Sequence, residues 1–174
     1  MKHEKQVQRK IVLIVHDIRS THNVGSLLRT ADCLGVDEVY LTGYTPYPKH
    51  EHDERLPHIS AKLTSQIHKT ALGAETFVRW KHSTSVTFTI SKLRRAGYSV
   101  VALEQTAEST SILSWMPSDK IAILLGREVE GIDPSLLKLC EYAVQIPNLG
   151  QKESLNVVQA AAIALYQARF AVSQ

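Results

Sequence analysis

The sequence predicts a single α/β domain whose parallel β-sheet is covered by helices on both faces. Short apolar runs rich in β-branched residues, such as 11–16 (IVLIVH), are typical of strands buried on both faces of a parallel sheet. These runs alternate with segments whose apolar residues recur at helical spacing, such as 23–34. Polar and glycine-rich residues directly follow several predicted strands, and such sheets bind ligands at the carboxyl ends of their strands. The predicted fold therefore also indicates where a functional site should lie.

The first predicted unit is a strand, a helix and a second strand. The strand at 11–16 leads to a helix over 23–34, with Asn23 as a suitable N-cap and Gly35 as a natural stop. The apolar face of this helix contains Val24, Leu27, Leu28, Ala31 and Leu34. Residues 36–42 read as the second strand.

The middle of the chain is less regular. Residues 44–57 hold three prolines and the charged stretch KHEHDER, which together indicate a loop. A helix is expected over 59–70 and a short strand over 77–82. Two readings stay open for 83–96, because its β-branched residues disfavour a helix whereas its apolar spacing before Gly97 favours one.

The last part returns to strands and helices. Strands are expected at 98–103, 120–125 and 142–146, and a short helix at 134–140 begins with a proline. A long helix at 154–171 closes the chain. Its apolar face runs through Val157, Ala161, Leu165 and Ala168.

The composition is that of an ordinary globular protein, with 44% hydrophobic and 21% charged residues in a chain of one-domain length. We expect a basic tail over 1–10 and one domain over 11–174. The net charge of +3 is compatible with a nucleic-acid partner without demonstrating one. No apolar run reaches membrane-spanning length, and the polar start is unlike a secretory signal. Two widely spaced cysteines fit a reducing compartment, so a cytoplasmic protein without a membrane partner is expected.

The first stretch that could carry chemistry is 17–32 (DIRSTHNVGSLLRTAD), a polar loop that opens a helix. Gly25 would allow close approach of another backbone. Arg29 stands among apolar neighbours and needs a partner nearby. A structural salt bridge is the usual explanation, and a grip on a phosphate is the functional one.

The second stretch follows the strand at 120–125 and has the arrangement G-x-E-x-x-G at 126–131. Gly126 and Gly131 would let the backbone turn tightly beside a flat ligand. Glu128 could orient that backbone or meet a cation, or it could simply lie near the N-terminus of the next helix. No Gly-Lys-Ser/Thr follows, so this is not a P-loop.

The third stretch, 146–167, begins with an irregular loop containing Pro147 and Gly150. Ser154 and Asn156 come at the start of the last helix, where the commonest role of such residues is capping. The alanines at 160–162 permit close packing against another element or a partner subunit.

A metal site is not expected. All eight histidines precede residue 83, and His50 and His52 lie in the proline-containing loop without the spacing of a metal site.

Taken together and in this order, the three stretches resemble the signature motifs of the SpoU (TrmH-type) RNA methyltransferases of the SPOUT class. The matches are N-x-x-x-x-x-R-T-A at 23–31, L-x-G-x-E-x-x-G at 124–131, and I-P-x-x-G-x-x-x-S-L-N with its alanine-rich helix at 146–162. The segment KTALGAE at 69–75 also looks familial, and the resemblance covers nearly all of 11–170. Differences from the usual pattern at Asn148 and at 158–159 concern loop packing and the dimer face.

The resemblance implies properties that periodicity could not supply. It implies a C-terminal deep trefoil knot whose loops bind S-adenosylmethionine, and a homodimer with the active site built across the interface. It also implies methyl transfer to a ribose 2′-oxygen of RNA, with tRNA expected ahead of rRNA. The expected domain at 11–174 is then a single SpoU-type methyltransferase domain that needs no metal.

The resemblance also assigns residues. Arg29 matches the catalytic arginine and Asn23 its motif partner, while Glu128, Ser154 and Asn156 match the other catalytic positions. The expected cofactor-binding positions are Leu103, Gly126, Ile146 and Leu155. A guanidinium stays protonated in proteins, so we expect Arg29 to stabilise the developing alkoxide while a phosphate oxygen or water takes the proton.

Three other functions remain open on the sequence. One is an RNA- and cofactor-binding protein without catalysis, although all the matched site residues are present. Another is a base-specific knotted RNA methyltransferase, which would normally carry a different acid/base residue. The last is a dinucleotide-binding domain, which the absence of G-x-G-x-x-G after the first strand disfavours.

Overall fold

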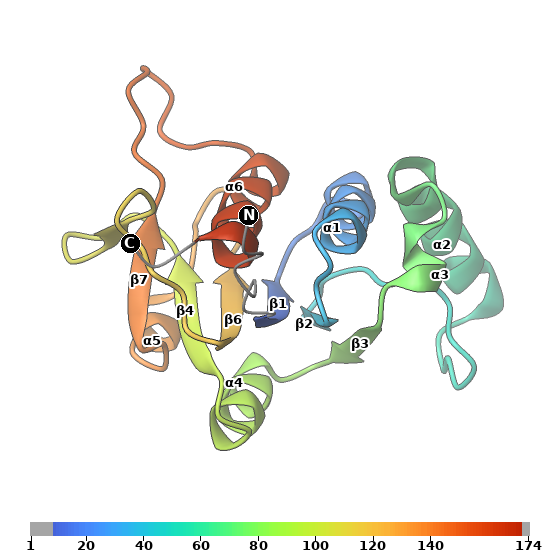
Figure 1. The fold of residues 1–174 in the computed structure, drawn as a ribbon. Helices are drawn as coiled ribbons and strands as arrows, with labels where there is room; N and C mark the ends of the chain where they lie inside the picture. Colours follow the sequence, from blue (N-terminus) through green and yellow to red (C-terminus); the bar gives the residue numbers. More distant parts are fainter. Residues whose placement is uncertain (1–8, 172–174) are drawn as a thin grey trace, which may run out of the picture.

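The computed structural model describes residues 9–171 and confirms the predicted class, a parallel sheet between two layers of helices (Figure 1). In chain order the elements are β1 (Lys10–His16), α1 (Thr21–Cys33), β2 (Glu38–Thr42), α2 (Pro57–Ala71), α3 (Ala74–Phe77), β3 (Trp80–Ser83), α4 (Val86–Arg95), β4 (Ser99–Leu103), β5 (Thr110–Ser111), β6 (Lys120–Leu125), α5 (Pro134–Leu137), β7 (Tyr142–Gln145) and α6 (Val157–Phe170).

The seven-stranded sheet has the order β3-β2-β1-β6-β4-β7-β5, and every neighbouring pair is parallel. Strands β1, β2 and β3 follow one another toward one side of the sheet, and β4 to β7 form the other side. The direction of the strand order therefore reverses between β1 and β6. In this register Leu13 of β1 lies opposite Val39 of β2 on one side and Ile123 of β6 on the other. Because all strands run the same way, the loops after β4, β6 and β7 meet at one edge of the sheet. The expected trefoil knot stays a prediction.

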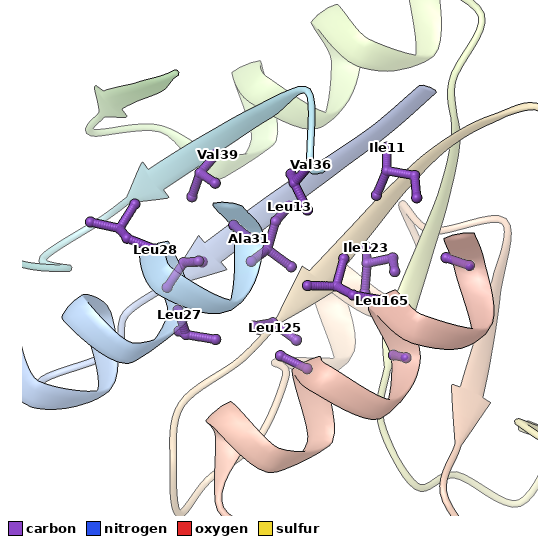
Figure 2. Close-up of a cluster of buried hydrophobic side chains, with 14 of the residues drawn as sticks. Ile11, Leu13, Leu27, Leu28, Ala31, Val36, Val39, Ile123, Leu125 and Leu165 are labelled. Carbon is purple, nitrogen blue, oxygen red and sulfur yellow. The ribbon is translucent and has the colours of Figure 1, made fainter. Parts of the chain in front are cut away.

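Two hydrophobic clusters, one on each face of the sheet, hold the layers together. Helices α1 and α6 lie side by side on one face, with α2 beyond α1, while α4 and α5 cover the other face (Figure 1). Figure 2 shows Leu27 and Leu28 of α1 and Leu165 of α6 directed at the strand side chains beneath them. Burying each such leucine contributes roughly 1.5–3 kcal/mol.

The termini of helices differ from the predicted positions for identifiable reasons. Helix α1 begins two residues earlier than predicted because Ser20, not Asn23, is its N-cap, with the Ser20 hydroxyl accepting a hydrogen bond from the Asn23 N–H (3.2 Å). The ambiguous segment contains α4, because Val86, Ile90 and Leu93 form one buried helical face whose packing outweighs weak propensity.

Other differences are smaller. The short helix α3 and the two-residue strand β5 were not predicted. Strand β3 cannot begin at 77 as expected, because Phe77 belongs to α3, and it begins at Trp80. Helix α6 begins at Val157 rather than at 154. Gly25 packs as predicted, since a Cβ there would lie 2.2 Å from the Ile67 carbonyl oxygen of α2.

The expected basic tail falls mostly on residues 1–8, outside the described part of the chain. Its last residues belong to the fold, because Lys10 begins β1 and the buried Arg9 guanidinium donates to the carbonyl oxygen of Ala171 (2.8 Å). Within residues 9–171, no helix is both long and apolar enough to cross a bilayer.

Candidate active site at the carboxyl edge of the sheet

A cavity of about 320 Å³ opens where the loops after β4, β6 and β7 converge. The sequence matches assigned four cofactor-binding residues, and all four line it: Leu103, Gly126, Ile146 and Leu155. Glu128 and Ser154 line it as well. The volume falls in the lower part of the range of about 300–1,000 Å³ that is typical of small-molecule sites.

The wall after β6 is a tight turn that only glycine can form. Arg127 and Gly131 exchange two backbone hydrogen bonds (3.1 and 3.2 Å), and Gly131 has a φ of 70°. A Cβ on Gly126 would lie 2.6 Å from the Gly131 carbonyl oxygen, and one on Gly131 would lie 2.4 Å from a carboxylate oxygen of Glu104. The two glycines therefore shape the cavity wall.

Glu104 fixes this turn from the neighbouring strand. Its carboxylate accepts hydrogen bonds from the backbone N–H groups of Ile132 and Gln105, both at 2.9 Å. Glu104 was not among the predicted site residues, and the available signal was its place directly after β4. Glu104 thus couples the loop after β4 to the loop after β6.

Glu128 lies at the N-terminus of a helix, but this helix is α1 rather than the next helix in sequence. Its carboxylate accepts hydrogen bonds from the backbone N–H groups of Arg19 and Ser20 (both 3.4 Å) and from the side-chain amide of Asn23 (3.3 Å). A carboxylate at a helix N-terminus is favoured by the helix dipole. Glu128 therefore joins the first and second motif stretches.

Asn156 joins the third stretch to the other two. Its side-chain N–H donates to the side-chain oxygen of Asn23 (3.4 Å), and its own oxygen caps α6 by accepting from the Val158 N–H (2.9 Å). Asn156 is thus both a cap and a member of the cluster, whereas Ser154 is exposed on the cavity wall and caps nothing.

Arg29 is the one predicted catalytic residue that stands apart. It lies six residues after Asn23, which places it about 9 Å further along the helix axis and on a different side. Its side chain is exposed, does not line the cavity and forms no ion pair with any residue in 9–171. Within the part of the chain that the structure describes, Arg29 therefore has no partner for the salt-bridge explanation.

The edge of the site contains a buried carboxylate, Asp17, which was not among the predicted site residues. Asp17 adopts a φ of 55°, accepts from the Tyr44 N–H (3.1 Å) and holds the Arg127 guanidinium (3.3 Å). The hydrogen bond to Asp17 raises the pKa of Arg127, and contact with the Tyr44 hydroxyl raises the pKa of Arg19. The available signal was an acidic residue, Asp17, directly after a buried strand.

Among the described residues, no cluster of three or more His, Cys, Asp or Glu side chains is placed to hold a metal ion. The proline-containing loop instead folds over the edge strand β3, where Tyr47 stacks on His82 with ring centroids 4.0 Å apart.

The fold and the cluster of motif residues define the class of protein. Residues 10–166 match the model of the SpoU rRNA methylase family, and the chain belongs to this family.

Curated relatives agree with that assignment. A Staphylococcus haemolyticus protein assigned to the TrmH family of tRNA/rRNA methyltransferases is 32% identical over 90% of this chain and 57% of its own length. A Staphylococcus saprophyticus protein of the same description is 30% identical over 94% of this chain and 61% of its own length. The chain therefore spans about three fifths of these relatives.

Solved structures share the fold. The SpoU methyltransferase AviRb of Streptomyces viridochromogenes, in complex with AdoMet, superposes with a TM-score of 0.75 at 22% identity, covering 92% of this chain and 57% of AviRb. The A. aeolicus TrmH/SpoU tRNA modifying enzyme gives a TM-score of 0.75 at 20% identity, covering 94% of this chain and 78% of that one.

Proposed function

We propose that this protein transfers a methyl group from S-adenosylmethionine to a ribose 2′-oxygen of RNA. The observation that carries the proposal is the meeting of Glu128, Asn23 and Asn156, one from each motif stretch, beside a cavity lined by the four expected cofactor residues. Family membership supports methyl transfer, and the AdoMet complex of a structural neighbour supports the cofactor.

The cavity suits S-adenosylmethionine in size and chemistry. Leu103, Ile146 and Leu155 offer apolar surface for the adenine ring, and the backbone at Gly126 can approach the ligand because no Cβ intervenes. When bound, the cofactor supplies an electrophilic methyl group on a sulfonium. The protein then has to hold the ribose hydroxyl in line with that methyl group, and such alignment can supply about 7–11 kcal/mol.

The polar side chains at the rim would orient the RNA. Ser154 is exposed on the wall, and Asn156 is held between α6 and Asn23, so the Asn156 amide has a fixed direction. Arg29 stabilises the alkoxide that forms on the 2′-oxygen, because a guanidinium does not accept a proton near neutral pH. A phosphate oxygen or a water takes the proton.

The distance of Arg29 from the cavity supports a homodimer with a shared active site. Helix α6, beside α1, presents an exposed apolar face in which the Tyr166 and Phe170 rings lie 4.8 Å apart, with Ile163 also exposed. A second copy that covers this face would bring its own Arg29 toward the first copy's cavity. Membership of the SpoU family also leads us to infer a trefoil knot around the loops after β4, β6 and β7.

The substrate class follows from the reaction, since only RNA offers a 2′-hydroxyl. We propose tRNA first and rRNA second, in a cytoplasmic protein. The two competing functions are a catalytically silent binder and a base-specific methyltransferase. An experiment with labelled methyl groups distinguishes them, because each function predicts a different position of the label.

That experiment measures transfer of labelled methyl groups from S-adenosylmethionine to undermodified total tRNA and, separately, ribosomal RNA, with Arg29→Ala as the control. Label on a ribose 2′-oxygen that disappears with Arg29→Ala is the expected result. Label on a base would indicate the base-specific enzyme, and cofactor binding without label on any RNA the silent binder. Failure to bind S-adenosylmethionine would overturn the proposed function.

A further inference from the structure

Charge is distributed very unevenly along the chain. Between Glu75 and Glu104 there is no acidic residue, which makes this the longest acid-free stretch in the sequence. The same stretch carries five cationic side chains: Arg79, Lys81, Lys92, Arg94 and Arg95. Helix α4 forms its centre, and basic residues concentrate in the last turn of that helix.

The exposed side of α4 forms a continuous strip. While one side packs on the sheet, the exposed side chains are Thr87, Phe88, Ser91, Lys92, Arg94 and Arg95, and Phe88 is 60% exposed. Because α4 connects the carboxyl end of β3 to the amino end of β4, its first turn lies at the edge that holds the active site. The strip then runs about 15 Å across the face of the sheet.

The cations of the strip have no ion-pair partner among the described residues. Lys92, Arg94 and Arg95 form no ion pair with any residue in 9–171, whereas the nearby Lys81 is paired with Glu38 (2.5 Å). The Lys92 ammonium lies 5.8 Å from the centre of the Tyr40 ring, which orients it without cancelling its charge. Lys92 also lies near enough to Glu38 to help lower the pKa of that carboxylate, whereas Arg94 and Arg95 have no acidic partner within residues 9–171. The last turn of α4 can therefore still bind an anionic partner.

The strip lies on the face of the sheet that the proposed dimer interface does not use. Helices α1 and α6, which would carry the proposed dimer interface, cover the opposite face of the sheet (Figure 1). A second copy docked on α6 would leave α4 accessible.

We propose that the exposed strip of α4 binds the ribose–phosphate backbone of the RNA substrate outside the catalytic cavity. The inference rests on the proposed function and adds a second contact surface to it. Lysine, arginine and hydroxyl side chains are the groups that commonly contact phosphates, and an exposed aromatic ring such as Phe88 can stack on an unpaired base. The RNA would cross from the active-site edge along α4, so the enzyme would hold it at two places.

A purely structural role makes a different prediction. Basic residues in the last turn of a helix also stabilise it through the helix dipole. In that case their removal would change stability and leave RNA affinity unchanged.

The test compares two double variants of the 174-residue chain. Lys92→Gln/Arg95→Gln removes two charges from the strip, and Lys62→Gln/Lys69→Gln removes two charges from α2, where Lys69 also occupies a last turn. Binding of undermodified total tRNA and of ribosomal RNA is measured between about 50 and 200 mM salt, without methyl transfer. Calorimetry with S-adenosylmethionine and thermal unfolding verify that each variant is folded.

The expected result is roughly tenfold weaker RNA binding for the α4 variant, with a salt-dependence slope smaller by about 1.4–1.8. The α2 variant should bind like the unmodified protein, and the charge-conserving Lys92→Arg/Arg95→Lys should retain affinity. Equal RNA binding by the α4 variant and the unmodified protein would overturn the RNA-binding strip and leave the proposed function standing. An unmodified protein that binds the cofactor and no RNA would overturn both.

Discussion

The side-chain amide of Asn156 lies 3.4 Å from the side-chain oxygen of Asn23, a residue 133 positions earlier in the chain. Asn23 in turn donates to Glu128, so one chain of hydrogen bonds joins the three loops that carry the family motifs. Each member holds the next in place. The site should therefore respond to changes in these residues as a unit.

Replacing Glu128 with glutamine should reduce methyl transfer by at least about tenfold. The substitution keeps the shape of the side chain but removes its negative charge. Its oxygen then accepts more weakly from two backbone N–H groups at the start of α1 and from the Asn23 amide. Hydrogen bonds to a charged group contribute about 1.5–3 kcal/mol each. Steady-state kinetics gives the measurement. Glu130→Gln, an exposed neighbour, is the matched control, and equal activity of the two variants would contradict the role of Glu128.

Gly131→Ala should abolish S-adenosylmethionine binding and lower the free energy of unfolding by about 1–2 kcal/mol. The added Cβ would collide with the Glu104 carboxylate, and the φ of 70° disfavours any residue with a side chain. Calorimetric titration and thermal unfolding measure the two effects. Gly150→Ala is the control, because the nearest atom to a Cβ there is 3.7 Å away.

The shared active site predicts complementation between inactive variants. If Arg29 acts across the interface, mixing Arg29→Ala with Asn156→Ala should restore activity, because each mixed dimer contains one intact site. Random exchange of subunits would restore about a quarter of the sites. Mixtures with no more activity than the separate variants would show that Arg29 acts within its own subunit, or not at all.

Stability should fall as the pH drops below about 6.5, the ordinary pKa of histidine. Burial lowers the pKa of His16, assisted by Arg127 and opposed by Asp17, and burial also lowers the pKa of His82. The unfolded chain therefore binds protons at these positions before the folded protein does. The stabilisation is complete above pH 6.5 and is lost as the pH falls through the lowered pKa values.

Chemical denaturation at several pH values between 5 and 8 tests this dependence on acid. His16→Gln and His82→Gln should each make the free energy of unfolding less dependent on pH in this range. An unchanged slope in both variants would assign the acid sensitivity to other groups.

Local sequence patterns were sufficient to predict the alternation of strands and helices and to indicate the family. Buried parallel strands need continuous apolar runs, so β1, β4 and β6 were predicted within a residue or two. The four residues assigned to the cofactor pocket also line the cavity together, because their motifs lie directly after strands that share an edge.

The partners of the site residues depend on how the chain folds in three dimensions. Glu128 binds the backbone just before a helix that begins more than a hundred residues earlier, Glu104 supports a turn after a different strand, and Arg29 does not line the cavity of its own chain. The register of the sheet and the packing of α1 beside α6 set these relations. Such contacts depend on strand order rather than on spacing along the chain, and local sequence patterns carry no information about strand order.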